Sequence, residues 1–295
     1  MTFVDSKPLT RFAIDANASM HFHFLGEQAL HCTYLAGNAA PEVWQTSADY
    51  TWLELCVAES GDLVADSKAV YAELMRKVRA SKHPYLIRIW NYLADINAGD
   101  EDAERYRQFC VGRAQAVDAL FNSPPPAATG IGYCGVNTGL HVIALCSNKP
   151  AIALENPRQT PAWQYPRQYG KVSPGFSRGA LLKTDGENTL LLASGTASIV
   201  GHASMHVGDV AEQCCESLRN LRALLDEGEK LGNVQFDFSA CQSLRVYVRD
   251  PSQLPIIQAE FESSGIPVPQ IVYVHGEVCR RELMVELEGV FGAAS

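Results

Sequence analysis

Residues 177–198, SRGALLKTDGENTLLLASGTAS, contain two short apolar segments on either side of a polar run. Apolar segments of this length favour strands, which we expect at about 179–184 and 189–194. Downstream, apolar residues recur at helical spacing over 209–230 and predict a helix there. The remaining predicted elements of this half are a helix at 252–264 and strands at 243–248, 270–275 and 283–290.

The N-terminal half repeats this order of strand, strand, helix, strand, helix, strand, strand. Residue identity between the halves is poor, so the repeat depends on element order alone. The predicted elements are strands near 29–35, 50–57, 85–93, 129–134 and 140–147, with helices at 66–80 and 101–122.

The repeat predicts an α+β fold with two similar domains, which we place at residues 1–150 and 151–295. Each domain would form a mixed β-sheet with two helices packed on one face, and the other sheet face would be buried against its twin. Hydrophobic residues make up 47% of the 295 residues, enough to bury a sizeable core.

Charge and composition narrow the classes of function. The net charge of −9 disfavours a nucleic-acid binder, which usually carries a basic face. The chain has neither a run of about 18 apolar residues nor the basic and apolar start of a secretory signal. We therefore expect a cytoplasmic protein without a membrane span, whose nine cysteines stay reduced and mostly buried.

One stretch of the chain departs from the acidic average. Residues 156–183 contain five Arg and Lys residues and no Asp or Glu. Four prolines within 155–178 forbid a continuous helix and disfavour a central strand, and a loop this long in a compact protein is usually functional or disordered. Guanidinium groups bind carboxylates through two parallel hydrogen bonds, so the loop is a candidate anion site. The alternative is that these arginines form a solvated rim or pair with acids elsewhere.

The last predicted strand carries a second candidate. Glu286 and Glu288 alternate with apolar residues and share one face of the strand. A buried carboxyl has a raised pKa and can act as a general acid, whereas both glutamates would be unremarkable on the solvent face of an edge strand. The histidines His202, His206 and His275 match no standard zinc spacing, so we expect no metal.

Three long segments of the C-terminal half resemble the reactive-intermediate deaminase superfamily, whose members are small mixed-sheet domains: residues 177–198, 208–232 and 272–289. Three further segments resemble its chorismatase branch, which joins two such domains in one chain: HPYLIRIWNYLADIN (83–97), ERYRQFCVGRAQA (104–116) and ENPRQTPAWQYPRQYGKVSPGFSR (155–178).

The resemblance implies a cofactor-independent enzyme that releases pyruvate from chorismate, a small dicarboxylate with an enolpyruvyl ether. Glu286 matches the first glutamate of the superfamily's terminal strand and would protonate the enolpyruvyl methylene. The substrate carboxylates would be bound by Arg158, Arg167 and Arg178, with Tyr165 as a hydrogen-bonding companion. Gly195 and Cys279 match the positions associated with product choice, and this combination resembles the type that forms 3-hydroxybenzoate.

Several alternatives stay open at this point. The product could be 4-hydroxybenzoate, a mixture, or a dihydroxycyclohexadiene carboxylate formed by hydrolysis. The protein could be an imine deaminase, although Tyr273 stands where that superfamily would place a carboxylate-binding arginine. It could also be a noncatalytic ligand-binding protein, because the fold alone does not specify an activity. We expect a monomer or a small homo-oligomer.

Overall fold

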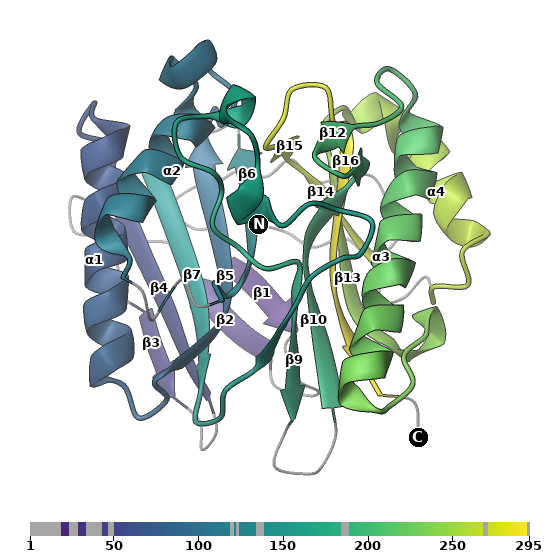
Figure 1. The fold of residues 1–295 in the computed structure, drawn as a ribbon, viewed down its shortest axis with the longest axis horizontal. Helices are drawn as coiled ribbons and strands as arrows, with labels where there is room; N and C mark the ends of the chain where they lie inside the picture. The colour runs from purple at the N-terminus through teal and green to yellow at the C-terminus, as the bar shows by residue number, and fades with distance from the viewer. Residues whose placement is uncertain are drawn as a thin grey trace.

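The protein folds into two α+β halves that pack against each other through their sheets. The computed structural model describes residues 19–23, 29–33, 43–46, 50–118, 121, 124–133, 139–183, 189–267 and 271–293, with side chains from residue 50 onward. In Figure 1, α1 and α2 lie on one outer side, α3 and α4 lie on the other, and the two sheets lie between them.

The N-terminal half has the predicted order of elements. Its sheet contains β3 (Val43–Thr46), β4 (Tyr50–Ala58), β5 (Tyr85–Ala94), β6 (Ala127–Tyr133) and β7 (Gly139–Ser147), and its helices are α1 (Leu63–Ala80) and α2 (Arg105–Ala116). A separate two-stranded sheet pairs β1 (Ser19–His23) with β2 (Ala29–Thr33).

The C-terminal half repeats the arrangement. Its sheet contains β8 (Ile152–Leu154), β9 (Gly179–Lys183), β10 (Thr189–Ala197), β13 (Cys241–Val248), β14 (Ile271–His275) and β16 (Val285–Gly292), and its helices are α3 (Val210–Gly232) and α4 (Leu254–Glu262). The remaining strands are β11 (Ile199–Val200), β12 (Ala203–Ser204) and β15 (Glu277–Val278).

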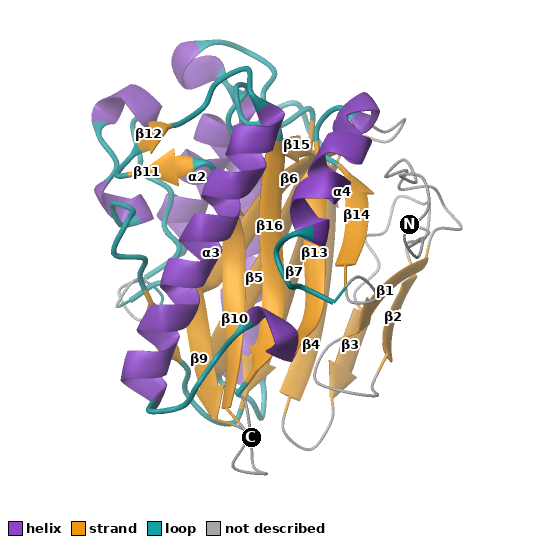
Figure 2. Cartoon of the chain, turned by 90° about the vertical axis from the view of Figure 1, so that its right-hand side faces the viewer, coloured by secondary structure: helices purple, strands orange, loops and turns teal. Residues whose placement is uncertain are grey.

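The strand orders confirm the predicted repeat. The sheets run β15-β6-β5-β7-β4-β3 and β14-β13-β16-β10-β9-β8, so β6-β5-β7-β4-β3 matches β14-β13-β16-β10-β9 strand for strand. In each sheet the pair formed across the second helix, β5 with β6 and β13 with β14, is parallel. Figure 2 shows α3 and α4 lying across the face of the C-terminal sheet.

The strand expected at 29–35 does not join the N-terminal sheet, so this part of the prediction is wrong. The strand expected at 29–35 is β2, but it pairs with β1, and β3 takes the edge position beside β4. The helix expected at 101–122 ends earlier, at Ala116, because Val117 is extended. The expected strand ends at residues 34–35, 134, 184 and 270 lie outside the described residues.

The helix boundaries follow local capping. α1 begins three residues before the expected Asp66, because Asp62 caps it by accepting a hydrogen bond from the Ala65 N–H. α2 begins after the predicted residue 101, because Glu101 has a positive φ of 49° and belongs to a separate 3₁₀ turn. α3 follows its N-cap Asp209 and ends at Gly232, because its C-cap Asn233 takes the left-handed conformation.

Alternation along the strands produces three buried layers. In β16, Val285, Leu287 and Phe291 pack under α3 and α4, whereas Val290 faces the other sheet. The layer between the sheets contains aromatic side chains of both halves, including Trp90, with Tyr92 and Tyr247 hydroxyls 3.1 Å apart. None of the helices in the described part of the chain combines the length and apolar character needed to cross a membrane.

Three connections between the halves shape the space at one end of the sheets. β15 leaves the C-terminal half and pairs with β6 at the edge of the N-terminal sheet. Ser177, near the end of the Pro-rich segment, forms a bridge with Ala127 and donates a 2.6 Å hydrogen bond to the Pro125 carbonyl. The proposed division at residues 150 and 151 lies between β7 and β8 and stays a prediction.

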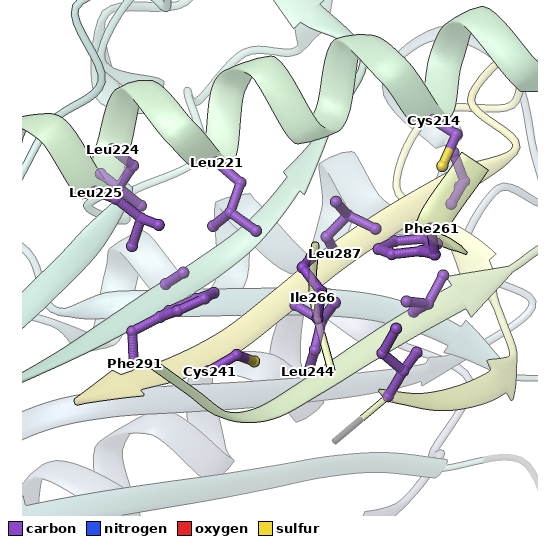
Figure 3. Packing of buried hydrophobic residues seen from close by; sticks show 14 of the residues in the cluster. Cys214, Leu221, Leu224, Leu225, Cys241, Leu244, Phe261, Ile266, Leu287 and Phe291 are labelled. Atoms are coloured by element: carbon purple, nitrogen blue, oxygen red, sulfur yellow. The ribbon is translucent and has the colours of Figure 1, made fainter. Parts of the chain in front are cut away.

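The helix-to-sheet core of the C-terminal half gives a direct stability test (Figure 3). Leu221 of α3 is fully buried in this core, whereas Leu231 of the same helix is half exposed. We expect Leu221→Ala to lower the unfolding free energy by about 3 kcal/mol and Leu231→Ala to change it by less than about 0.5 kcal/mol. Urea unfolding of both variants checks this, and equal losses would contradict the assigned packing.

Candidate active site

A cavity of about 440 Å³ lies where the two halves meet, a volume that suits a small organic ligand. Both halves line it: Thr129 of β6 and Arg113 of α2 come from the first, and Gly195 of β10 and Glu286 of β16 from the second. The Pro-rich segment and the residues after β15 complete the walls.

Strand geometry aims Glu286 into this cavity. Its neighbours Val285 and Leu287 face the helices, so Glu286 and Glu288 face the other sheet. Both carboxyls are buried, and Glu286 is only 4% exposed. The alternative in which both glutamates lie on the solvent face of an edge strand is therefore wrong, because β16 is a central strand between β13 and β10.

A β-bulge in β10 makes room for the Glu286 carboxyl. Ala193 pairs with Gly289 and Thr196 with Leu287, so β10 carries one extra residue there. Gly195 lies in this bulge, and a Cβ at that position would overlap Glu286 Oε1. The Gly195 N–H donates to Thr129 Oγ1 at 2.9 Å, which fixes the bulge against the N-terminal half.

Glu288 is held as a carboxylate by five donors from both halves. Arg88 Nη2, at 2.8 Å, and the Thr129 hydroxyl bind Oε2, while Trp90 Nε1, Tyr247 OH and Arg245 Nη1 bind Oε1. Burial opposes ionisation, but the two guanidinium groups and the hydroxyl donors outweigh it and hold the pKa of Glu288 below its usual 4.5.

Glu286 has the opposite protonation behaviour. Burial, followed by the negative charge of Glu288, raises the pKa of Glu286 to about 8, against the smaller opposing effect of Arg88, Arg178 and Arg249. Glu286 is therefore mostly protonated at neutral pH. Two neighbouring carboxyls with separated pKa values are a common arrangement in acid catalysis.

Arg178 and Tyr165 form one corner of the cavity. Arg178 is 2% exposed and donates through Nη2 to the Tyr165 hydroxyl at 2.7 Å and to the Thr160 carbonyl at 3.0 Å. Its Nε has no hydrogen-bond partner among the described residues, and its guanidinium forms no ion pair with any of them. An anion in the cavity could satisfy this charge.

Arg280 completes the same corner and was missed from the sequence. Its guanidinium lies 4.0 Å from the Tyr169 ring centroid and 5.1 Å from that of Tyr165, and its buried Nη2 has no partner within the described chain. Arg280 directly follows Cys279, which also lines the cavity. The sequence offered no signal to separate it from Arg281, which hydrogen-bonds to the 97–100 segment.

Two predicted substrate-binding residues lie outside the cavity lining. Arg158 pairs with Glu216 of α3, and Arg167 forms two hydrogen bonds with Asp102 at 3.0 and 2.7 Å. Acids from other segments pair with both arginines, which is the alternative considered for the loop, and their place in the anion site stays a prediction without support from the structure.

The structure also shows where several other residues considered in the sequence lie. Cys279 is a thiol, since burial raises its pKa to about 12. His202 lies beside Tyr169, and His206 lies 3.4 Å from Glu216. In the described part of the chain, no group of three or more His, Cys, Asp or Glu side chains could hold a metal. Tyr273 packs on Phe261 in the helix-to-sheet core, away from the cavity.

Two halves with one strand order and a cavity between them define the class: a tandem α+β protein with a candidate active site where its halves meet. Residues 32–146 match the family model described as "Chorismatase FkbO/Hyg5-like, N-terminal". A 3-hydroxybenzoate synthase of Streptomyces hygroscopicus is 32% identical over 292 residues, covering 90% of this chain and 86% of the relative.

Two further comparisons agree. A chorismatase of Streptomyces rapamycinicus is 35% identical over 263 residues, covering 86% of this chain and 78% of the relative. A crystal structure of a chorismatase matches with a TM-score of 0.74 and 32% identity, covering 85% of this chain and 77% of that one. The chain belongs to the chorismatase family.

The raised pKa of Glu286 can be tested without any ligand. The folded protein holds a proton that the unfolded chain releases above its usual pKa of 4.5, so wild-type stability falls as pH rises toward about 8. We expect Glu286→Gln to gain stability relative to wild type by about 1.4 kcal/mol per pH unit over this range. Urea unfolding at pH 5, 6, 7 and 8 measures this difference.

Glu262→Gln, which changes an exposed carboxyl at the end of α4, is the matched control. A difference between Glu286→Gln and wild type that stays constant from pH 5 to pH 8 would show that Glu286 is ionised throughout.

Proposed function

We propose that this protein converts chorismate to 3-hydroxybenzoate and pyruvate, with Glu286 as the general acid. The observation that carries the proposal is a protonated, buried carboxyl in a cavity whose walls also carry Arg178 and Arg280, neither of which is paired with a described carboxylate. A dicarboxylate with an acid-sensitive enol ether fits both features. The family relatives bear the names chorismatase and 3-hydroxybenzoate synthase.

The reaction begins with proton transfer from Glu286 to the methylene carbon of the enolpyruvyl ether. The C=C bond becomes a methyl group and the ether carbon becomes an oxocarbenium ion, while Glu286 becomes a carboxylate. Arg88, Arg178 and Arg249, which oppose the raised pKa before reaction, then stabilise this charge. A pKa of about 8 keeps the acid form populated at neutral pH.

The oxygen that traps the cation decides the product. Attack by the ring hydroxyl leads, with loss of pyruvate and a ring proton, to a hydroxybenzoate without consumption of water. Attack by water instead gives a dihydroxycyclohexadiene carboxylate and pyruvate. Cys279 offers only a weakly hydrogen-bonding thiol, and Gly195 offers no side chain, so neither holds a water firmly in place. This favours the hydroxybenzoate route.

The substrate carboxylates require cations at sites that leave Glu286 protonated. Arg178 with Tyr165, and Arg280 stacked on the same tyrosine, form one such site. The assignment of these residues to substrate, the absence of a cofactor, the cytoplasmic location and the monomeric or small homo-oligomeric state are predictions.

Incubation with chorismate tests the proposal. We expect pyruvate and 3-hydroxybenzoate in equal amounts, and for Glu286→Gln a fall in kcat of about 1,000-fold or more, because the amide cannot donate the proton. The activity should decline as pH rises through about 8, where Glu286 loses its proton. Chromatography of the products measures all three.

Glu262→Gln, on the exposed end of α4, should retain wild-type turnover. 4-Hydroxybenzoate or the diene carboxylate as main product would overturn the product assignment alone. Release of no pyruvate would reject the reaction and leave imine hydrolysis or ligand binding.

Gly195→Ala tests the close approach of the bulge to the acid. The added methyl group would overlap Glu286 Oε1, so the carboxyl must move away from its present position. We expect kcat to fall by about 10-fold or more, because small displacements of a proton donor are costly, and the product ratio to change. Steady-state kinetics and product chromatography measure both, and unchanged kinetics would contradict the geometry.

Gly265→Ala is the control for an added methyl group away from the site. No atom lies within 4 Å of the position that its Cβ would take. Its positive φ of 78° makes alanine somewhat strained there, so this variant should lose a little stability and keep wild-type kcat.

A further inference from the structure

A loop of the Pro-rich segment, residues 165–173, forms one wall of the cavity, and we call it the cover loop. Its residues Tyr165, Gln168 and Tyr169 line the cavity. The Ser173 hydroxyl donates to the Tyr165 carbonyl at 2.8 Å, which ties the two ends of the loop together. A compact surface loop with joined ends can move as one body.

The chain is fixed on both sides of the cover loop. Before the loop, the Thr160 N–H donates to the Gly201 carbonyl at 2.8 Å, and after it the Ser177 N–H donates to the Pro126 carbonyl at 3.1 Å. Between these anchors, in the part of the chain that the structure describes, no backbone group of residues 161–176 hydrogen-bonds with the backbone of another segment. A segment of this kind opens at a lower free energy than the strands and helices around it.

The outer side of the cover loop is attached to the first half through Asp102. This carboxylate accepts two hydrogen bonds from Arg167, and Lys171 Nζ lies 3.5 Å from it. The Arg167 and Lys171 side chains are 62% and 65% exposed, and exposed ion pairs contribute little stability. Asp102 belongs to a 3₁₀ turn whose Glu101 also lines the cavity, so these ion pairs join two walls of the cavity.

The two arginines of the Pro-rich segment that lie outside the cavity differ in the burial of their partners. Arg158, next to the fixed anchor, pairs with a Glu216 side chain that is only 6% exposed, whereas Asp102, the partner of Arg167, is 30% exposed. Separation of the first pair would leave a charge buried without a partner, but separation of the second would leave both charges in water. Arg158 therefore has the environment of a structural contact, and Arg167 that of a reversible one.

We propose that the cover loop opens to admit ligands to the cavity, and that Asp102 holds it closed by binding Arg167 and Lys171. Closure of such a loop excludes water from a reaction site. Around Glu286 this would matter for the product, since water is the competing nucleophile. The inference rests on the proposed function for the identity of the ligand, whereas the motion of the loop can be measured without any ligand.

Trypsin cleavage after Arg167 and Lys171 measures the opening, because a protease cuts a segment that has detached from the fold. We expect Asp102→Asn to be cut at these two bonds about threefold faster than wild type. Raising NaCl from about 0.02 to 0.5 M should speed cleavage of wild type and narrow this difference, because salt screens the exposed ion pairs. Mass spectrometry of the fragments identifies the bonds that are cut.

Asp118→Asn is the matched control. It removes the exposed ion pair with Arg79, outside the cavity lining, and should leave cleavage of the cover loop at the wild-type rate. A second variant, Arg167→Gln, should speed cleavage after Lys171. The double variant Asp102→Asn/Arg167→Gln should be cut there no faster than Asp102→Asn, because Asp102→Asn already removes the pair.

Binding kinetics separate control of entry from a contact with the ligand. In the Glu286→Gln background, Asp102→Asn should raise the association and dissociation rates of chorismate by the same factor of about three and leave Kd nearly unchanged. Stopped-flow fluorescence measures both rates. Cleavage of Asp102→Asn at the wild-type rate, or a changed Kd with only one rate altered, would overturn the inference. Failure of the proposed function gives a different result, namely a wild-type protein that releases no pyruvate but whose cover loop still responds to Asp102→Asn.

Discussion

Both halves of the protein hydrogen-bond to one buried carboxylate, that of Glu288. It lies between the two sheets and accepts hydrogen bonds from Arg88, Trp90 and Thr129 of the first half and from Arg245 and Tyr247 of the second. Removal of an arginine would take away a charge that balances the buried carboxylate, and removal of a neutral donor would leave the carboxylate short of a hydrogen bond, which makes such clusters intolerant of partial change. Glu288 therefore joins the halves and also supplies the negative charge that helps to keep its neighbour Glu286 protonated.

The repeat provides the same strand position twice, but only one copy carries an acid. Glu286 is opposite Tyr247 across β13 and β16, and in the first half His141 is opposite Tyr92 across β5 and β7. Burial lowers the pKa of His141 to about 4, so this imidazole is neutral near pH 7 and cannot replace a protonated carboxyl as an acid. Of these two equivalent strand positions, only that of the second half carries an acid. The first half contributes wall residues and cations to the cavity around Glu286.

Periodicity predicted most of the elements because each half has strongly apolar strands and one long amphipathic helix. It failed where the place of a strand in the sheet depends on the strand with which it pairs. The edge strand β3 was missed, since nothing local distinguishes a strand that joins the sheet from β2, which pairs elsewhere. The sequence likewise predicted some residues of the cavity lining and included others that lie outside it. Glu286, Gly195, Cys279, Arg178 and Tyr165 line one cavity, but Arg158 and Arg167 carry the same charge in the same loop and pair with acids that are distant in sequence. Composition predicts an anion-binding loop; tertiary contacts alone select which arginine remains unpaired.

The bulge in β10 shows why the acid could not have been positioned by the sheet alone. In a regular ladder the residue opposite Glu288 would carry a side chain on the inter-sheet face and would compete with Glu286 for space. The extra residue in β10 shifts the register between Ala193 and Thr196 and leaves Gly195 backbone against the carboxyl. Thr129 ties this backbone to Glu288 by accepting from the Gly195 N–H and donating to Oε2. The position of the acid and the charge that sets its pKa are therefore coupled through one hydroxyl, so a change at either glutamate should alter the environment of the other.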